Sequence, residues 1–263
     1  MNSPNIYLRQ GNIVFSREFV DILRSKEITL TRRNNFTRSC IIINHGNSKP
    51  YSIGRNVSKL YFLNHPDAIH YCCNKKHNWN ILKDFYPNVY SNSELNGDIN
   101  FPIIAKPLNG HHGYGIVVVK DRKQLDSISN KNSYIFQDLI PIKHEFRFNV
   151  LDRDVFQISH RQRLDEETDE GGYVFSYRSL GNDAKISGKF RNYVLDVIKK
   201  FHEVVGYSVA DYCVDVMKGT DNEYYLSEIN SAYGIGQYTI EKLVDSINYK
   251  YDEGKLEQYR VGT

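Results

Sequence analysis

The 263-residue sequence predicts a mixed α/β fold. Residues 145–150 alternate apolar and polar side chains, which predicts a strand, and residues 155–163 are expected to pair with it as the next antiparallel strand. Lys189–Val205 is the clearest predicted helix and ends at Gly206, a usual helix stop; its apolar stripe is Val194, Val197, Ile198, Phe201 and Val205. Asp215–Gly234 has two strand-forming runs separated by turn residues, which predicts a β-hairpin. A chain of this length buries a substantial core, as one large domain or as two or three packed lobes.

The composition is that of an ordinary globular protein, with 40% hydrophobic and 25% charged residues. The net charge is +3 and no basic stripe is concentrated in one region, so a nucleic-acid partner is not indicated. The first residues do not form a secretory signal, and no window approaches the roughly 18 apolar residues that span a bilayer. We therefore expect a cytoplasmic protein without a membrane partner. Its four cysteines form no CxxC pair and are expected to be reduced.

The first sixty residues predict a small α/β lobe. Strand candidates are Ile6–Leu8, Ile13–Phe15 and the β-branched run Cys40–Asn44, and Glu18–Ser25 is a plausible helix. The segment Asn64–Lys83 then predicts two helical pieces with a lysine pair between them. Taken alone, such a pair is more often solvated surface than part of a site.

Phe101–Lys120 predicts a strand, a glycine-rich loop at 109–115 and a second strand. Closely spaced glycines let backbone N–H groups turn inward and hold phosphate oxygens. Lys106 ends the incoming strand, where it would reach a ligand beneath the loop. The loop joins two strands and is therefore neither a Walker loop nor a dinucleotide fingerprint, both of which open a helix. A plain glycine-rich hairpin remains the alternative.

The central segment predicts a short helix at Gln124–Ser129 and a strand at Tyr134–Ile140. Glu145 and Arg147 are two residues apart, so a strand would carry both on one face. The next strand brings further arginines, and Asp165–Gly172 is expected to be a mobile acidic loop. The final predicted helix is Thr239–Ile247.

The hairpin near the C-terminal end is the strongest candidate for a metal site. Glu228 and Asn230 leave the same face of one strand, and Asp215 lies on the partner strand where it could stand beside them. Two carboxylates and an amide oxygen are hard donors that suit Mg²⁺ or Mn²⁺ held together with phosphate oxygens. From the hairpin alone, acids that simply face solvent are an equally good interpretation.

The ordered series of motifs between residues 64 and 236 resembles the ATP-grasp superfamily, in particular RimK-type glutamate ligases and D-alanine–D-alanine ligases. Asn64, Ala68, Ile69, Asn74 and Lys75 match the pattern around the first lysine, with Asn74 replacing the usual Asp. Short pieces, among them IIINHGNS, are also similar to phage-encoded carboxylate–amine ligases. The resemblance implies two α+β subdomains that grip ATP, preceded by a small N-terminal lobe.

The resemblance also implies domain boundaries and residue roles. The N-terminal lobe would span 1–66 and the ATP-grasp domain 67–263, with a lid at about 74–137 and a metal-binding subdomain at about 138–250. Nucleotide contacts would come from Lys75, Lys106, Gly110, Gly113, Gly115, Gln137, Asp138, Leu139 and Glu145. The magnesium ligands would be Asp215, Glu228 and Asn230, and the catalytic arginines Arg147, Arg161 and Arg178. Asp138 stands where most relatives carry Glu, and Tyr233-Gly234 replaces a Pro-Gly.

The implied function is that of an ATP-dependent carboxylate–amine ligase that works through an acyl phosphate and releases ADP and phosphate. Its partners would be ATP, a carboxylic acid and an amine. The sequence offers no convincing nucleophilic Ser or Cys, in agreement with a reaction that rests on positioning and charge neutralisation. Two alternatives remain, a small-molecule kinase and a nucleotide-binding module without catalysis.

Overall fold

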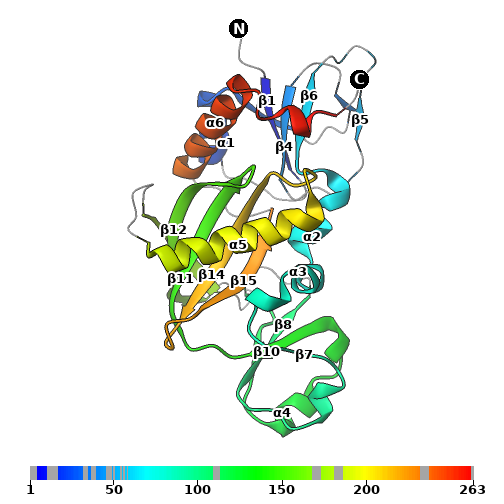
Figure 1. Cartoon of the computed structure of the whole chain (residues 1–263), viewed down its shortest axis with the longest axis vertical. Coiled ribbons are helices and arrows are strands. Elements are labelled where there is room, and N and C mark those ends of the chain that lie inside the picture. Colours follow the sequence, from blue (N-terminus) through cyan, green and yellow to red (C-terminus); the bar gives the residue numbers. More distant parts are fainter. Residues whose placement is uncertain are drawn as a thin grey trace.

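The computed structural model of the protein describes residues 5–10, 17–31, 35–36, 40–45, 49, 51–53, 55, 57, 59–108, 113–167, 173–180, 186–231 and 237–261. Three bodies follow one another along its longest axis (Figure 1). An N-terminal lobe lies at one end, a large sheet crossed by a long helix lies in the middle, and a small lid lies at the other end. This mixed content confirms the predicted fold class.

The helices are α1 (Arg17–Ser25), α2 (His70–Cys73), α3 (Lys75–Leu82), α4 (Arg122–Ser127), α5 (Gly188–Val205) and α6 (Gln237–Asp252). The strands are β1 (Asn5–Gln10), β2 (Ile28–Thr31), β3 (Asn35–Phe36), β4 (Cys40–His45), β5 (Ser52–Ile53), β6 (Leu60–Leu63), β7 (Val89–Tyr90), β8 (Ile103–Pro107), β9 (Val117–Val119), β10 (Tyr134–Asp138), β11 (Ile142–Leu151), β12 (Asp154–Glu167), β13 (Tyr173–Ser179), β14 (Asp211–Gly219) and β15 (Tyr224–Asn230). None of these helices is both long and apolar enough to cross a membrane.

The N-terminal lobe is built on a parallel sheet in the order β2-β1-β4-β6. Its central strand β4 is apolar without interruption from Cys40 to Ile43, because a parallel strand with both faces covered meets no solvent. One face packs on α6 through Ile240, Leu243 and Ile247. The same cluster includes residues of the large sheet, so α6, expected within the metal-binding subdomain, contacts both bodies.

Asn64 connects the N-terminal lobe to the large sheet at the end of β6. Its side-chain oxygen accepts hydrogen bonds from the backbone N–H groups of Ala210 and Asp211, each at 2.8 Å. Its side-chain nitrogen donates to the carbonyl oxygens of Asn44 and Asp211. The residue is fully buried and has a φ of 71°, a left-handed conformation that Asn tolerates better than most residues. Asn64 thus fixes the junction between the two bodies.

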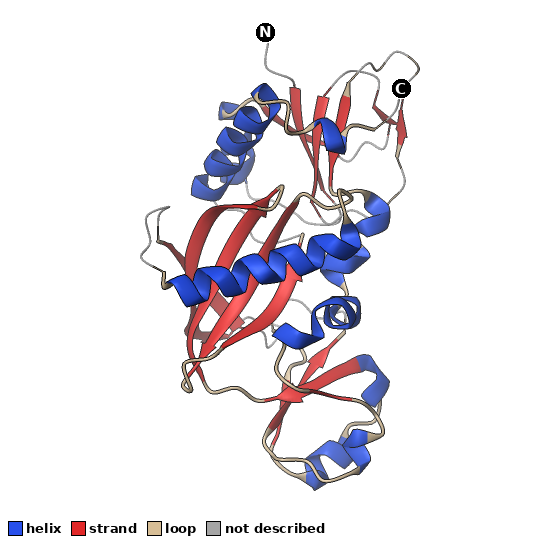
Figure 2. Ribbon diagram, viewed as in Figure 1, coloured by secondary structure: helices blue, strands red, loops and turns tan. Residues whose placement is uncertain are grey.

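The large sheet is antiparallel, in the order β13-β12-β11-β14-β15, and its two faces differ in chemistry. Phe148, Val214 and Ile229 point to one face and pack against the apolar stripe of α5, which crosses that face in Figure 2. Since side chains alternate along each strand, the intervening residues point to the other face. Among them Arg147 and Asp215 are polar and buried. Helix α5 therefore covers the apolar face of the sheet and does not cover the polar face.

The lid is a four-stranded antiparallel sheet in the order β7-β10-β8-β9, with α4 packed on one side. Ile103, Ala105 and Phe136 face the apolar core beneath α4. The alternate residues Ile104 and Lys106 point the other way, toward the large sheet. One subdomain thus presents a lysine-bearing face to the polar face of the other.

Two local predictions are corrected by the structure. The segment Asp165–Glu167 is strand, not loop, because β12 extends to pair Glu167 with Tyr173 of β13. The lysines predicted between two helical pieces instead begin α3, whose first turn is capped by the Asn74 side chain. The strand expected at Ile13–Phe15 lies outside the described residues.

Candidate functional site

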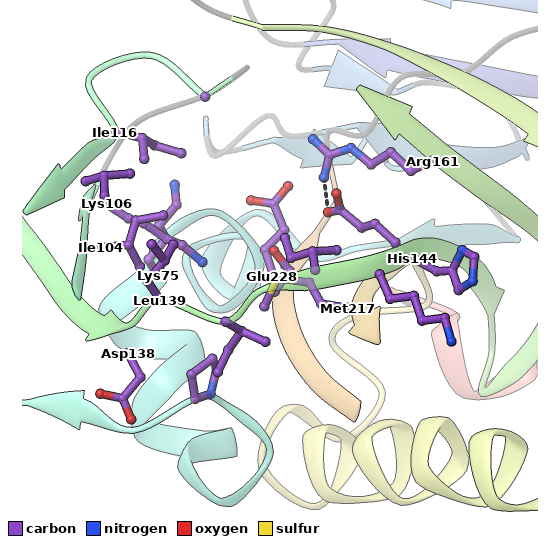
Figure 3. Close-up of a pocket in the computed structure, with 18 of the residues that line it drawn as sticks. Lys75, Ile104, Lys106, Ile116, Asp138, Leu139, His144, Arg161, Met217 and Glu228 are labelled. Carbon is purple, nitrogen blue, oxygen red and sulfur yellow. Dashed lines mark hydrogen bonds and ion pairs between the residues drawn. The ribbon is translucent and has the colours of Figure 1, made fainter. Parts of the chain in front are cut away.

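A cavity of about 680 Å³ lies between the lid and the large sheet. Lys75, Lys106 and Glu228 are directed into the same space, with Arg161 across from them (Figure 3). Apolar residues from both sheets complete the wall. They include Ile104, Ile116, Val118, Leu139, Ile140, Ile142 and Met217. A concave site with an apolar wall and a few convergent polar groups is typical of a small-ligand pocket.

The register of the large sheet places three charged residues in one row. Arg147 of β11 lies opposite Asp215 of β14, which in turn lies opposite Glu228 of β15. Residues opposite one another in an antiparallel sheet point to the same face, so the predicted proximity of Asp215 and Glu228 is present. Asn230, two residues beyond Glu228 on its strand, projects from that same face.

Asp215 is fully buried beneath the cavity and is held by two arginines. Arg147 donates from Nε to Oδ1 and from Nη2 to Oδ2, each at 2.7 Å. Arg161 adds a longer contact of 3.3 Å from Nη1 to Oδ2. Burial alone would raise the pKa of Asp215, but the charges and hydrogen bonds of Arg147, with the charge of Arg161, hold that pKa below its ordinary value. The carboxylate is therefore ionised at neutral pH.

Arg161 also reaches Glu145 on the neighbouring strand, and its Nη1 lies 2.6 Å from Oε1 of that carboxylate. This is the bond drawn as a dashed line in Figure 3. Burial raises the pKa of Glu145 above its ordinary value, an effect that the Arg161 charge partly offsets. One guanidinium thus connects the carboxylate expected to bind ribose with the carboxylate expected to bind metal.

The two predicted phosphate lysines come from different elements and meet in the cavity. Lys106 lies on β8, and burial lowers its pKa to about 8, despite the nearby charges of Glu228 and Glu145. Lys75 is the first residue of α3, and the Asn78 side chain of that helix donates to the Ile229 carbonyl of β15 at 3.4 Å. The helix that carries Lys75 is thereby anchored beside the β14–β15 hairpin.

The predicted hinge residues, two at the end of β10 and one directly after it, differ in where their side chains point. The Asp138 carboxylate is turned away from the lysines in Figure 3 and accepts a 2.5 Å hydrogen bond from the Tyr90 hydroxyl. Gln137 projects from the same face of the lid sheet as Ile104. Its amide is buried, and neither its oxygen nor its nitrogen has a hydrogen-bond partner among the described residues. Leu139 lines the cavity.

The glycine flap is described only from Gly113 onward, and the predicted residue Gly110 lies outside the described residues. Gly113 and Gly115 have φ values of 77° and 70°, which glycine adopts without strain. A Cβ added to Gly115 would also lie 3.0 Å from the Cγ of Pro107. The φ values account for glycine at both positions, and the Pro107 contact does so at Gly115. Gly113 lines the cavity.

The hairpin offers a donor set that fits Mg²⁺ shared with a phosphate. The predicted oxygen donors on its polar face are the carboxylates of Asp215 and Glu228 and the amide of Asn230, of which Glu228 lines the cavity. The described residues contain no group of three or more Asp, Glu, His or Cys that could hold a metal by themselves. Mg²⁺ usually binds through one or two carboxylates together with substrate phosphates, so this smaller set matches that use.

Two of the three predicted catalytic arginines do not line the cavity. Arg147 is buried against Asp215 and positions that carboxylate from below. Arg178 lies opposite His160 in the β12–β13 ladder, so it projects from the face opposite to that of Arg161 and is exposed. Arg161 is the one of the three that lines the cavity.

The sequence reasoning missed most of the apolar wall and the Tyr90 partner of Asp138. Ile104 is two residues before Lys106 on β8, and Met217 is two residues after Asp215 on β14. The alternation of strand side chains could therefore have indicated both. Tyr90 could not have been found in this way, because it is distant in sequence and reaches Asp138 only through the pairing of β7 with β10.

Comparison with known protein families supports the resemblance to ATP-grasp proteins. A family model described as an ATP-grasp domain, clade family 2, matches residues 90–244, more than half of the chain. A D-alanine–D-alanine ligase of Campylobacter jejuni is 26% identical over 186 residues, which are 66% of this chain and 53% of that protein. The chain thus spans about half the length of the curated relatives it matches.

Solved structures share the fold at low sequence identity. The ATP-grasp ligase PsnB, complexed with a phosphomimetic variant of minimal precursor, Mg and ADP, has a TM-score of 0.59 and 13% identity, over 94% of this chain and 99% of that one. A D-alanine–D-alanine ligase from Bacillus anthracis, complexed with ATP, has a TM-score of 0.57 and 14% identity, over 97% and 100% of the two chains. The fold and the family model agree with the resemblance inferred from the motifs: the chain belongs to the ATP-grasp domain family.

Proposed function

We propose that the protein is an ATP-dependent carboxylate–amine ligase that forms an amide through an acyl phosphate. One observation carries this proposal: Lys75 and Lys106 meet Glu228 in a single cavity between two subdomains. Cations that converge beside an acidic metal hairpin suit the polyphosphate of a nucleotide. The apolar wall offers a place for the base, and Glu145 an acceptor for the ribose hydroxyls.

The chemistry follows from the positions of the charges. A carboxylate is a poor acyl donor until one of its oxygens receives the γ-phosphoryl group, with ADP as the leaving group. Lys75, Lys106 and Arg161 supply positive charge where the transferred group would pass, and a transfer of this kind depends mainly on such positioning. The amine then attacks the acyl carbon, an amide bond forms, and phosphate leaves.

The hairpin residues Asp215, Glu228 and Asn230 would hold Mg²⁺ or Mn²⁺, which neutralises phosphate charge when bound. Arg147 keeps the Asp215 carboxylate ionised and fixed in orientation through its two hydrogen bonds. Arg178 has no role in this proposal, since it projects from the other face of the sheet.

Trapping with hydroxylamine tests the reaction. Purified protein is incubated with MgATP, hydroxylamine and a panel of carboxylic acids, and products are read by mass spectrometry. We expect a hydroxamate of one class of acid, formed together with ADP and phosphate in equal amounts and only when magnesium is present. AMP would indicate an adenylating enzyme, and a stable phosphorylated product insensitive to hydroxylamine would indicate a kinase. Either of these results would overturn the ligase proposal.

A further inference from the structure

Arg161 lies between two carboxylates of the site, Glu145 and Asp215. Its Nη1 lies 2.6 Å from Glu145 and 3.3 Å from Asp215, and its side chain is only 12% exposed. With one positive charge it therefore contacts two carboxylates on different strands. In the proposed function these two carboxylates serve different ligands, Glu145 the ribose and Asp215 the metal.

Each of these ligands competes with Arg161 for one carboxylate. A ribose hydroxyl must donate to Glu145, whose Oε1 already accepts a short charge-assisted bond from the guanidinium. A cation that approaches Asp215 meets the positive charge of the same guanidinium at Oδ2. Either ligand alone therefore has to displace part of the Arg161 bridge.

The two contacts of Arg161 are unequal, and Asp215 does not depend on the weaker one. Arg147 holds both Asp215 oxygens at 2.7 Å, so the carboxylate keeps its orientation when Arg161 leaves. The bond to Glu145 is the shorter arm of the bridge. Ribose binding at Glu145 would thus release the guanidinium and remove its charge from Asp215.

We propose that Arg161 couples the nucleoside site to the metal site, so that ribose and metal each strengthen the binding of the other. The first ligand displaces the bridge, and the second binds without that cost. Coupling between two sites is reciprocal by thermodynamic linkage. The released guanidinium still lines the cavity that contains Lys106, where it can turn toward phosphate. This inference rests on the proposed nucleotide site.

Adenosine is the probe that isolates this coupling, because it has no phosphate through which a metal could contact it. The affinity of the protein for Mn²⁺ is measured by electron paramagnetic resonance with and without saturating adenosine. Adenosine affinity is measured by calorimetry with and without Mn²⁺. We expect each ligand to raise the affinity for the other about fivefold or more. Arg161→Met keeps much of the length of the side chain without its charge and should abolish the effect.

Two further variants make the test specific. Glu145→Gln removes the charge at the shorter arm of the bridge and should reduce the coupling even if Arg161→Met folds poorly. Arg178→Ala, at the exposed arginine on the other face, should leave the coupling at the wild-type value. Mn²⁺ affinity that is unchanged by adenosine in the wild type, while MnATP still binds, would overturn the coupling and leave the proposed function intact. Failure of ATP itself to bind would overturn both.

Discussion

Arg147 and Asp215 lie opposite one another on adjacent strands and form two parallel hydrogen bonds of 2.7 Å within the buried part of the large sheet. The Asp215 side chain is fully buried and that of Arg147 is 6% exposed. In such a pair each charge depends on the other, because neither can be hydrated. The pair supplies an ionised, oriented carboxylate beneath the cavity.

Arg147→Met should lower the free energy of unfolding by roughly 3–5 kcal/mol, because it leaves the Asp215 charge buried without its main partner. Urea denaturation followed by circular dichroism measures the change. The control is Lys189→Met, which removes an ion pair with Glu223 whose side chains are 65% and 57% exposed. That pair should contribute no more than about 1 kcal/mol. Equal losses in the two variants would contradict the buried role of Arg147.

Glu228→Gln should abolish turnover while the fold persists, since a neutral amide binds Mg²⁺ much more weakly than a carboxylate. Calorimetry should find ATP binding weakened mainly when magnesium is present. Glu223→Gln, at an exposed acid next to the hairpin turn, should behave as the wild type. A folded Glu228→Gln protein with full activity would show that the hairpin does not hold the metal.

The affinity for ATP should depend on pH through Lys106, whose pKa burial lowers to about 8. The protonated amine binds phosphate, so the affinity should be constant well below pH 8 and fall as the pH rises through that value. The fall approaches about tenfold per pH unit until the pKa of the complex is reached. Calorimetry at pH values from about 6.5 to 9.5, which bracket this pKa, measures the fall in ATP affinity.

Lys106→Arg should remove this pH dependence, because arginine stays charged throughout the range. Adenosine affinity, which involves no phosphate, should not vary with pH in the wild type. The same decline with pH in Lys106→Arg would assign the titration to another group.

Gln137→Leu should weaken ATP binding about three- to tenfold and stabilise the free protein by roughly 1 kcal/mol. The buried Gln137 amide has no hydrogen-bond partner among the described residues, and an unpaired buried polar group costs about 1–3 kcal/mol. A nucleotide base in the adjacent cavity would offset this cost by supplying partners. Thermal unfolding and calorimetry measure the two effects. Stabilisation without any loss of ATP affinity would show that Gln137 does not contact the nucleotide.

Asn64→Ala should destabilise the protein by roughly 2–5 kcal/mol, because the backbone N–H groups of Ala210 and Asp211 lose a buried acceptor. Asn64→Asp keeps the acceptor and should cost less than Asn64→Ala. Amide hydrogen exchange at the start of β14 distinguishes loss of the acceptor in Asn64→Ala from its retention in Asn64→Asp. We expect protection at Ala210 and Asp211 to fall in the alanine variant and to persist in the aspartate variant.

Several parts of the site could be predicted because they depend on local spacing. Glu228 and Asn230 share a face for the reason that any strand alternates its side chains, and the same rule pairs Glu145 with Arg147. Sequence reasoning did not predict the face of Arg178, which the resemblance gave as catalytic, because the register of β12 with β13 places it on the face opposite to that of Arg161. It also missed the extension of β12 to Glu167, which rests on pairing with β13.

The sequence by itself determined the order of the motifs, the mixed α/β class and the chemistry of the hairpin, because these depend on residue identity and on neighbours a few positions apart. Only the tertiary structure decided which charges meet. Arg147 and Asp215 are 68 residues apart, yet strand pairing makes them a buried pair. Pairing within the same sheet also places Arg161 in contact with both Glu145 and Asp215. Burial makes these contacts necessary, because a charged group that is excluded from water needs an opposite charge or a hydrogen-bond partner within the protein.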